Sequence, residues 1–170
     1  MANKPPAANS QAMADACKQA DYQCINTPIV VSLKTQDGLG FSSTLPPPTP
    51  VIQDKQIVVY PGQTLNIEAA IAQGQVTNLR LVDSVTHPEK TLVVSLKQVK
   101  SGAQYLMMLD IHNPFDAKLK YHAGIMPLEE PKDVPAGTMY KTSTCPVMAK
   151  GGANESWNNS LFQVVLADIH

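Results

Sequence analysis

Residues 105–126 read YLMMLDIHNPFDAKLKYHAGIM, and this stretch decides the fold class. Apolar and polar side chains alternate on both sides of Asn113-Pro114, which is the pattern of half-buried strands. Because paired strands must agree in which face is apolar, we expect the two halves to pair as a β-hairpin. The apolar sets are Tyr105, Met107, Leu109 and Ile111 in the first half, and Leu119, Tyr121, Ala123 and Ile125 in the second.

Short runs with the same period of two recur along the chain, separated by turn residues such as Pro61-Gly62 and Ser101-Gly102. About nine strands at this spacing, with only one helix, are typical of an all-β sandwich. The architecture is immunoglobulin-like or transthyretin-like in the loose sense, with a barrel as the alternative, and it carries no function by itself. The predicted strands are 28–34, 56–60, 64–71, 78–83, 91–99, 105–112, 119–126, 138–144 and 161–169.

The N-terminal part of the chain lacks this period. Residues 1–9 are rich in Pro, Ala and Asn and are expected to be disordered, whereas the alanine-rich stretch from Ser10 to Tyr22 predicts a short helix. We therefore divide the chain into a disordered N-terminus with a short helix over 1–24 and a single β-sandwich domain over 25–170. Within the domain, Leu45–Pro50 is dominated by prolines and is expected to cross between strands in an extended conformation.

Composition excludes two kinds of partner. The net charge is −1, from 13 basic and 14 acidic residues without a basic run, so no nucleic acid is expected. No stretch approaches about 18 consecutive apolar residues, so no transmembrane segment is expected. The low charged fraction of 16% and a polar N-terminus without the apolar core of a signal peptide favour the mature form of a periplasmic or secreted protein. A cytosolic protein is the alternative.

Three cysteines suggest a possible disulfide. Cys17 and Cys24 lie seven residues apart in the sequence. On a continuous helix their Cα atoms would be about 10.5 Å apart, beyond the roughly 7 Å that a disulfide allows. That pair can bond only if the helix ends before Cys24. We expect a bridge from the N-terminal segment to the sheet, either Cys24–Cys145 or Cys17–Cys145, with no bridge as the alternative.

The predicted hairpin also supplies candidate metal ligands. In one register Met108 lies opposite His122 and Asp110 lies opposite Lys120. A thioether beside an imidazole favours copper, but two ligands do not make a site. Met126 lies about 13 Å from His122 along the strand and cannot join it. We therefore expect no cofactor, and we keep periplasmic copper binding through Met108, His122 and further Met or His as an alternative function.

Two long polar loops are expected at 129–137 and 148–160, and such loops at the ends of a sandwich are common binding places. The second holds the candidate partner-binding residues Trp157, Asn154 and Asn158, although a tryptophan here more often closes the end of the core. No hydrolase, phosphate-loop or metalloprotease motif is present. We predict a non-enzymatic extracytoplasmic binding protein whose partner is a protein or an envelope component. A cysteine-dependent enzyme, pairing Cys145 with a residue such as His122, is the second alternative.

Overall fold

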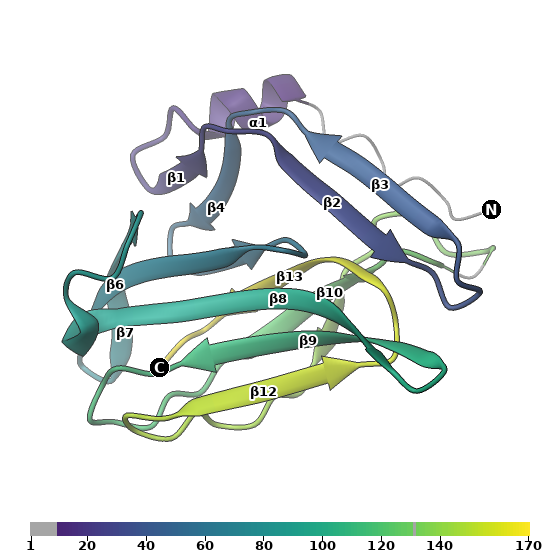
Figure 1. Cartoon of the computed structure of the whole chain (residues 1–170). Helices are drawn as coiled ribbons and strands as arrows, with labels where there is room; N and C mark the ends of the chain where they lie inside the picture. Colours follow the sequence, from purple (N-terminus) through teal and green to yellow (C-terminus); the bar gives the residue numbers. More distant parts are fainter. Residues whose placement is uncertain (1–9, 131) are drawn as a thin grey trace.

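The computed structural model describes residues 10–130 and 132–170, and the predicted disorder of residues 1–9 lies outside them. It is an all-β sandwich, as predicted (Figure 1). The six-stranded sheet has the order β1 (Tyr22–Ile25), β4 (Thr49–Gln53), β5 (Gln56–Val59), β13 (Leu161–Ala167), β10 (His122–Pro127) and β11 (Tyr140–Thr142). The five-stranded sheet has the order β12 (Gly152–Trp157), β9 (Gln104–His112), β8 (Thr91–Ser101), β6 (Thr64–Ala72) and β7 (Gln75–Val82). A ribbon of β2 (Ile29–Lys34) and β3 (Gly40–Leu45), the helix α1 (Ser10–Ala16) and the 3₁₀ turn η1 (Pro88–Lys90) complete the described chain.

The apolar residues that alternate along the strands form the core between the two large sheets. Met107 and Leu109 of β9 are fully buried, and so are Val164 and Leu166 of β13 in the opposite sheet. All four belong to one hydrophobic cluster. Burying each such side chain stabilises the fold by about 1.5–3 kcal/mol, so the inward rows of both sheets supply most of the packing energy.

The predicted hairpin of residues 105–126 is wrong, because its two halves lie in different sheets. β9 pairs with β8 and β12, whereas β10 pairs with β13 and β11. The fully buried Asn113 holds the chain where it crosses over. Its Nδ2 donates to the carbonyls of Ala117 (2.8 Å), Val147 (3.3 Å) and Met148 (3.1 Å), and its Oδ1 accepts the N–H of Phe115 (2.9 Å). A buried amide satisfied on all sides specifies one path for the backbone, and here that path leads to the other sheet.

Four strands of the described chain, β1, β3, β4 and β12, were not predicted from the sequence. β12 lies inside the predicted loop 148–160. β4 takes in Thr49 and Pro50, so the predicted proline crossing is wrong at its last two residues. Pro50 pairs with Cys24 where the register between β1 and β4 shifts. Such an irregular position in a ladder tolerates a residue that has no N–H to donate.

A disulfide is present, as expected, but its predicted pairing with Cys145 is wrong. α1 ends at Ala16, well before the predicted Tyr22, and turns over 17–21 lead the chain back toward the helix. Cys17 and Cys24 are therefore 6.0 Å apart between Cα atoms, and they form the disulfide. Cys145, which we expected to pair with one of them, is free and exposed. The error came from the length predicted for the helix, since a shorter helix removes the distance that excluded the Cys17–Cys24 pair.

The β2–β3 ribbon packs across one side of the sandwich and is attached to both sheets (Figure 1). The ring of Phe41 meets the ring of Phe162 edge-on, with centroids 6.3 Å apart. Gln98 of β8 accepts the N–H of Lys34 (2.7 Å) and donates to the carbonyl of Lys34 (2.8 Å). The side-chain amide of Gln98 thus substitutes for a neighbouring strand at the end of β2.

Candidate functional site

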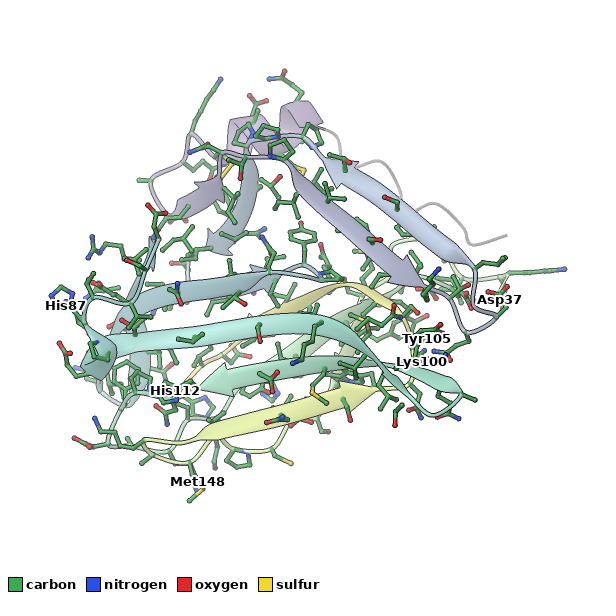
Figure 2. The ribbon with its side chains drawn as sticks, in the orientation of Figure 1. Asp37, His87, Lys100, Tyr105, His112 and Met148 are labelled. Atoms are coloured by element: carbon green, nitrogen blue, oxygen red, sulfur yellow. A yellow bond between two sulfur atoms is a disulfide. The ribbon has the colours of Figure 1, made fainter. Side chains whose placement is uncertain are left out.

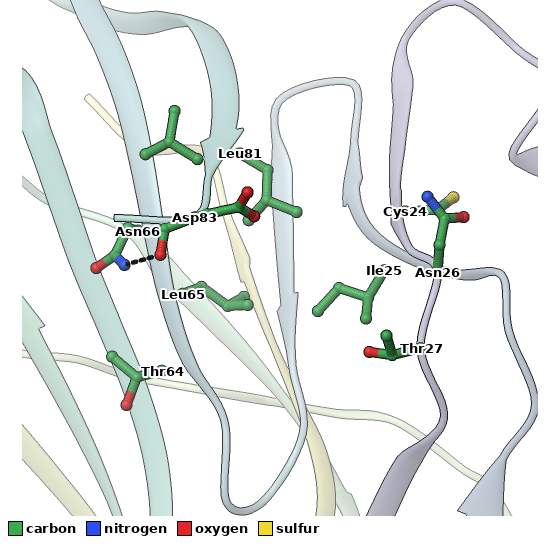
Figure 3. Close-up of a pocket in the computed structure, with 10 residues that line it drawn as sticks. Cys24, Ile25, Asn26, Thr27, Thr64, Leu65, Asn66, Leu81 and Asp83 are labelled. Atoms are coloured by element: carbon green, nitrogen blue, oxygen red, sulfur yellow. Dashed lines mark hydrogen bonds between the residues drawn. The ribbon is translucent and has the colours of Figure 1, made fainter. Parts of the chain in front are cut away.

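A groove of about 430 Å³ lies where β1, at the edge of one sheet, faces β6 and β7 of the other. Figure 3 shows Ile25 and Thr27 on one wall and Leu65 and Leu81 on the other. Cavities of about 300–1,000 Å³ are the usual size for ligand sites. The lining residues are Cys24, Ile25, Asn26, Thr27, Thr64, Leu65, Asn66, Leu81, Val82 and Asp83.

The β1 wall of the groove is held in place by specific bonds. Gln23 donates from Nε2 to the carbonyl of Leu79 (2.6 Å) and accepts the N–H of Leu81 at Oε1 (2.7 Å), so β1 is fastened to β7. The disulfide fastens Cys24 to Cys17 at the end of α1. A site whose walls are already fixed loses less conformational entropy when a partner binds.

The groove combines an apolar floor with a polar rim. Leu65 is buried, Ile25 and Leu81 are half-buried, and Thr27 and Asp83 are exposed. Asp83 is the one side chain in the lining that can carry a charge, because Cys24 is in the disulfide. The lining contains no nucleophile paired with a base, which is the arrangement that acid–base or covalent catalysis requires. The chemistry of the groove therefore suits binding.

Sequence reasoning missed every residue of this groove as a site. The groove exists only where the edges of two sheets meet, and the β1 wall is a strand of four residues, too short for its alternation to be recognised. Gln23 and Leu81, which form a hydrogen bond at this edge, are 58 positions apart in the sequence. No local pattern in the sequence indicates a contact of that kind.

The predicted Met108–His122 metal pair does not form. Met108 lies on the outer face of the five-stranded sheet and His122 on the outer face of the six-stranded sheet, with the core between them. Packed sheets are about 10 Å apart, so one ion cannot bind both side chains. The Sδ atom of Met108 instead lies 4.0 Å from Nδ2 of Asn154. Within residues 10–130 and 132–170, no three His, Cys, Asp or Glu side chains are grouped to hold a metal.

The three candidate partner-binding residues do not all face outward. Trp157 points inward from the edge strand β12 and packs against the core. Asn154 points outward from the same strand, beside Met108. Asn158 follows β12, and its carbonyl accepts a hydrogen bond from Nε2 of Gln36 (2.6 Å). A partner role for these residues stays a prediction.

Cys145 lies on the segment that crosses from β11 to β12. Its N–H donates to Oε1 of Glu155 (2.6 Å), and the hydroxyl of the preceding Thr144 donates to the carbonyl of Tyr121 (2.6 Å). Burial, followed by the nearby carboxylate of Glu155, raises the pKa of the Tyr121 phenol. His122 faces away on the outer side of β10, and the described chain shows no hydrogen bond between Cys145 and a histidine. The geometry therefore provides no Cys–His catalytic pair here.

The densest group of charges surrounds Glu68, a buried carboxylate on β6. Arg80 (2.6 Å), His87 (3.2 Å) and Lys90 (3.5 Å) all reach its oxygens. The hydrogen bond from Arg80 is the main reason that the pKa of Glu68 is lowered to about 2; burial opposes it, and His87 and Lys90 reinforce it. Figure 2 shows His87 at the end of the five-stranded sheet. These three side chains fasten β7 and the turn at η1 to β6, which is a structural role.

Comparison of the chain with protein-family models, with curated proteins and with solved structures found no match. Across the described residues, no helix is both long and apolar enough to cross a membrane. A sandwich architecture alone carries no function, so the groove and its chemistry are what a functional proposal has to rest on.

Proposed function

We propose that this protein is a non-enzymatic binding protein of an extracytoplasmic compartment, and that it holds its partner in the groove between β1 and β6–β7. The observation that carries the proposal is a cavity of about 430 Å³ with an apolar floor, a polar rim and one wall fixed by a disulfide. Apolar cavities with a few converging polar groups are the usual form of a binding site.

The disulfide beside the groove supports an extracytoplasmic compartment. Disulfides persist in oxidising compartments and are rare in the cytosol, and the Cys17–Cys24 bridge borders the groove directly. A protein or an envelope component is the partner that such a compartment offers. Asp83 as the single lining charge favours a neutral or basic ligand over an acidic one.

Site-specific photo-crosslinking tests the proposal. A photoreactive amino acid replaces Thr27 on the groove wall, and matched proteins carry it at the exposed Thr44 on β3 or at the exposed Asn154 on β12. Each protein is incubated with envelope and extracellular fractions of the source organism. We expect one discrete adduct from position 27, which disappears when Leu65→Trp fills the floor, and no such adduct from position 44.

Two results would contradict the groove as the site. The first is an adduct that forms from position 154 and not from position 27, which would return the site to the β12 surface. The second is an adduct at position 27 that survives the filled floor with unchanged yield. Near-ultraviolet circular dichroism and a cooperative thermal transition are used to check that Leu65→Trp is folded like the wild type.

A further inference from the structure

Gln23 occupies the place of an added strand at the edge of β7. In a parallel ladder, a residue of the incoming strand donates its N–H to the carbonyl of residue j−1 and accepts the N–H of residue j+1 of the neighbouring strand. The carboxamide of Gln23 does the same with its side chain, because it donates to the carbonyl of Leu79 and accepts the N–H of Leu81. One rung of a further strand is therefore already filled on β7.

The next rung is open and faces the groove. The N–H of Leu81 points away from β6, so its carbonyl points the same way. Asp83 follows the last residue of β7 in a bend, and its carbonyl lies 3.5 Å from Nδ2 of Asn66. Neither the Leu81 carbonyl nor the Asp83 N–H has a hydrogen-bond partner within the part of the chain that the structure describes. Both residues line the groove, with Ile25 and Thr27 across from them (Figure 3).

We propose that the partner is an extended polypeptide segment that binds by strand addition, donating to the carbonyl of Leu81 and accepting the N–H of Asp83. This inference rests on the proposed function and specifies its ligand. Extended peptides commonly bind at exposed sheet edges, where main-chain hydrogen bonds give affinity and side-chain pockets give specificity. Because Gln23 already occupies the hydrogen-bonding groups of Leu79 and Leu81 that face it, the incoming segment can begin to pair only beyond them.

The lining predicts the sequence of that segment. The side chains of Leu81 and Asp83 both line the groove, on the wall opposite Ile25 (Figure 3). The partner residues opposite them are then also two apart, one meeting the apolar floor of Ile25 and Leu65 and the other meeting the carboxylate of Asp83. We expect an apolar residue and a lysine or arginine separated by one position. The lining contains no aromatic side chain on which a sugar ring or a base could stack.

The test uses a phage-displayed library of random ten-residue peptides, selected on the folded wild-type protein. We expect enrichment of the apolar-x-basic pattern.

A synthetic peptide of the selected sequence should slow the amide exchange of Asp83 by about tenfold or more at saturation, as protection by one new hydrogen bond requires. The amides of β12 should be unchanged. Asp83→Asn and N-methylation of the peptide amide that faces Leu81 should each weaken binding by about three- to tenfold, the equivalent of one lost hydrogen bond or charge contact. Thr86→Ala, an exposed change outside the lining, is the matched control.

The outcomes separate this inference from the proposed function. Selected peptides that require Thr27 and Leu65 but leave the Asp83 amide unprotected would overturn strand addition and leave groove binding intact. If no selected peptide bound the wild type more tightly than Leu65→Trp, the ligand would not be a peptide. A crosslink from position 27 to a non-peptide partner would then still support the groove as the site. Failure of both experiments would remove both proposals.

Discussion

β7 and β12 form the two edges of the same five-stranded sheet, yet they end it in different ways. On β12, Glu155 points inward and its carboxylate accepts the N–H of Cys145 (2.6 Å). A charge turned toward the interior is one of the devices by which edge strands avoid pairing with other chains. Next to β7, Gln23 fills one rung and a groove of about 430 Å³ lies beside the following one. One edge carries an inward charge that opposes an added strand, and the other is the edge at which we propose that a strand adds.

The difference comes from what lies opposite each edge. β12 is followed within a few residues by the turn into β13, and the segment of Cys145 crosses beside it. β7 faces β1, an edge strand of the other sheet, which the disulfide holds in position. A groove at a sheet edge therefore requires a second wall that is fixed independently of the ligand.

Removing the disulfide should have the largest effect on this comparison. For a loop of this size, the loss of the Cys17–Cys24 bridge in the Cys17→Ser/Cys24→Ser protein should cost about 2–3 kcal/mol of unfolding free energy. Urea unfolding measures it. Amide exchange should accelerate in β1 and in the Leu79–Leu81 part of β7 and stay unchanged in β12. Equal acceleration at both edges would show that the bridge stabilises the whole sandwich and not the β7 side.

Replacing Gln23 should have an intermediate effect. Gln23→Ala removes two hydrogen bonds to β7, and at about 1 kcal/mol for each the expected loss is roughly 2 kcal/mol. Gln23→Glu keeps the shape but loses the donor to Leu79, so it should fall between wild type and Gln23→Ala. Gln75→Ala, an exposed change at the start of the same strand, is the control and should lie within about 0.5 kcal/mol of wild type. Thermal unfolding of the wild type and the three variants gives the order of their stabilities.

Neutralising the inward charge should change association more than stability. Glu155→Gln keeps an acceptor for the N–H of Cys145, so we expect a loss of unfolding free energy of at most about 1 kcal/mol. The edge then lacks its protecting charge, and self-association should increase with concentration in sedimentation velocity. The comparison is made in proteins that carry Cys145→Ser, which excludes bridging through Cys145 and keeps the Cys17–Cys24 disulfide. If Glu155→Gln stayed as monodisperse as wild type, some other feature protects β12.

The pH dependence of Glu68 gives the finest test of how β7 is held to β6. The pKa of Glu68 in the folded protein is about 2, below its ordinary value of 4.5, so the unfolded chain takes up a proton first as the pH falls. Its stabilisation is therefore fully present above about pH 4.5 and is lost between there and about pH 2. Glu68→Gln should flatten the fall in stability across that range. The free energy of unfolding of both proteins is measured by urea unfolding between pH 5 and pH 2.5. If it fell as steeply with pH in Glu68→Gln as in the wild type, the Glu68–Arg80 pair would not stabilise the folded protein.

The sequence predicts the class of fold but not the position of the site. The period of two is a local property, and residues such as Met107 and Leu109 point inward as their alternation requires. The path of the chain depends on long-range contacts, and three carbonyls converging on Asn113 send β9 and β10 to different sheets. The groove depends on such contacts as well, because Gln23 and Leu81 are far apart in sequence. The same limitation explains why Met108 and His122, which the hairpin register places side by side, lie on opposite faces of the sandwich.

Residue-resolved amide exchange in the free protein tests the central claim most directly. Leu81 donates its N–H to Gln23, whereas the N–H of Asp83, a residue of the groove lining, has no hydrogen-bond partner among the described residues. We predict that Leu81 exchanges at least about tenfold more slowly than Asp83, and that Gln23→Ala brings the two rates together while the amides of β12 stay as they are. If Leu81 exchanged as fast as Asp83 in the wild-type protein, or if Gln23→Ala left its rate unchanged, Gln23 would not be filling a rung of β7, and the edge beside the groove would not be prepared for a further strand.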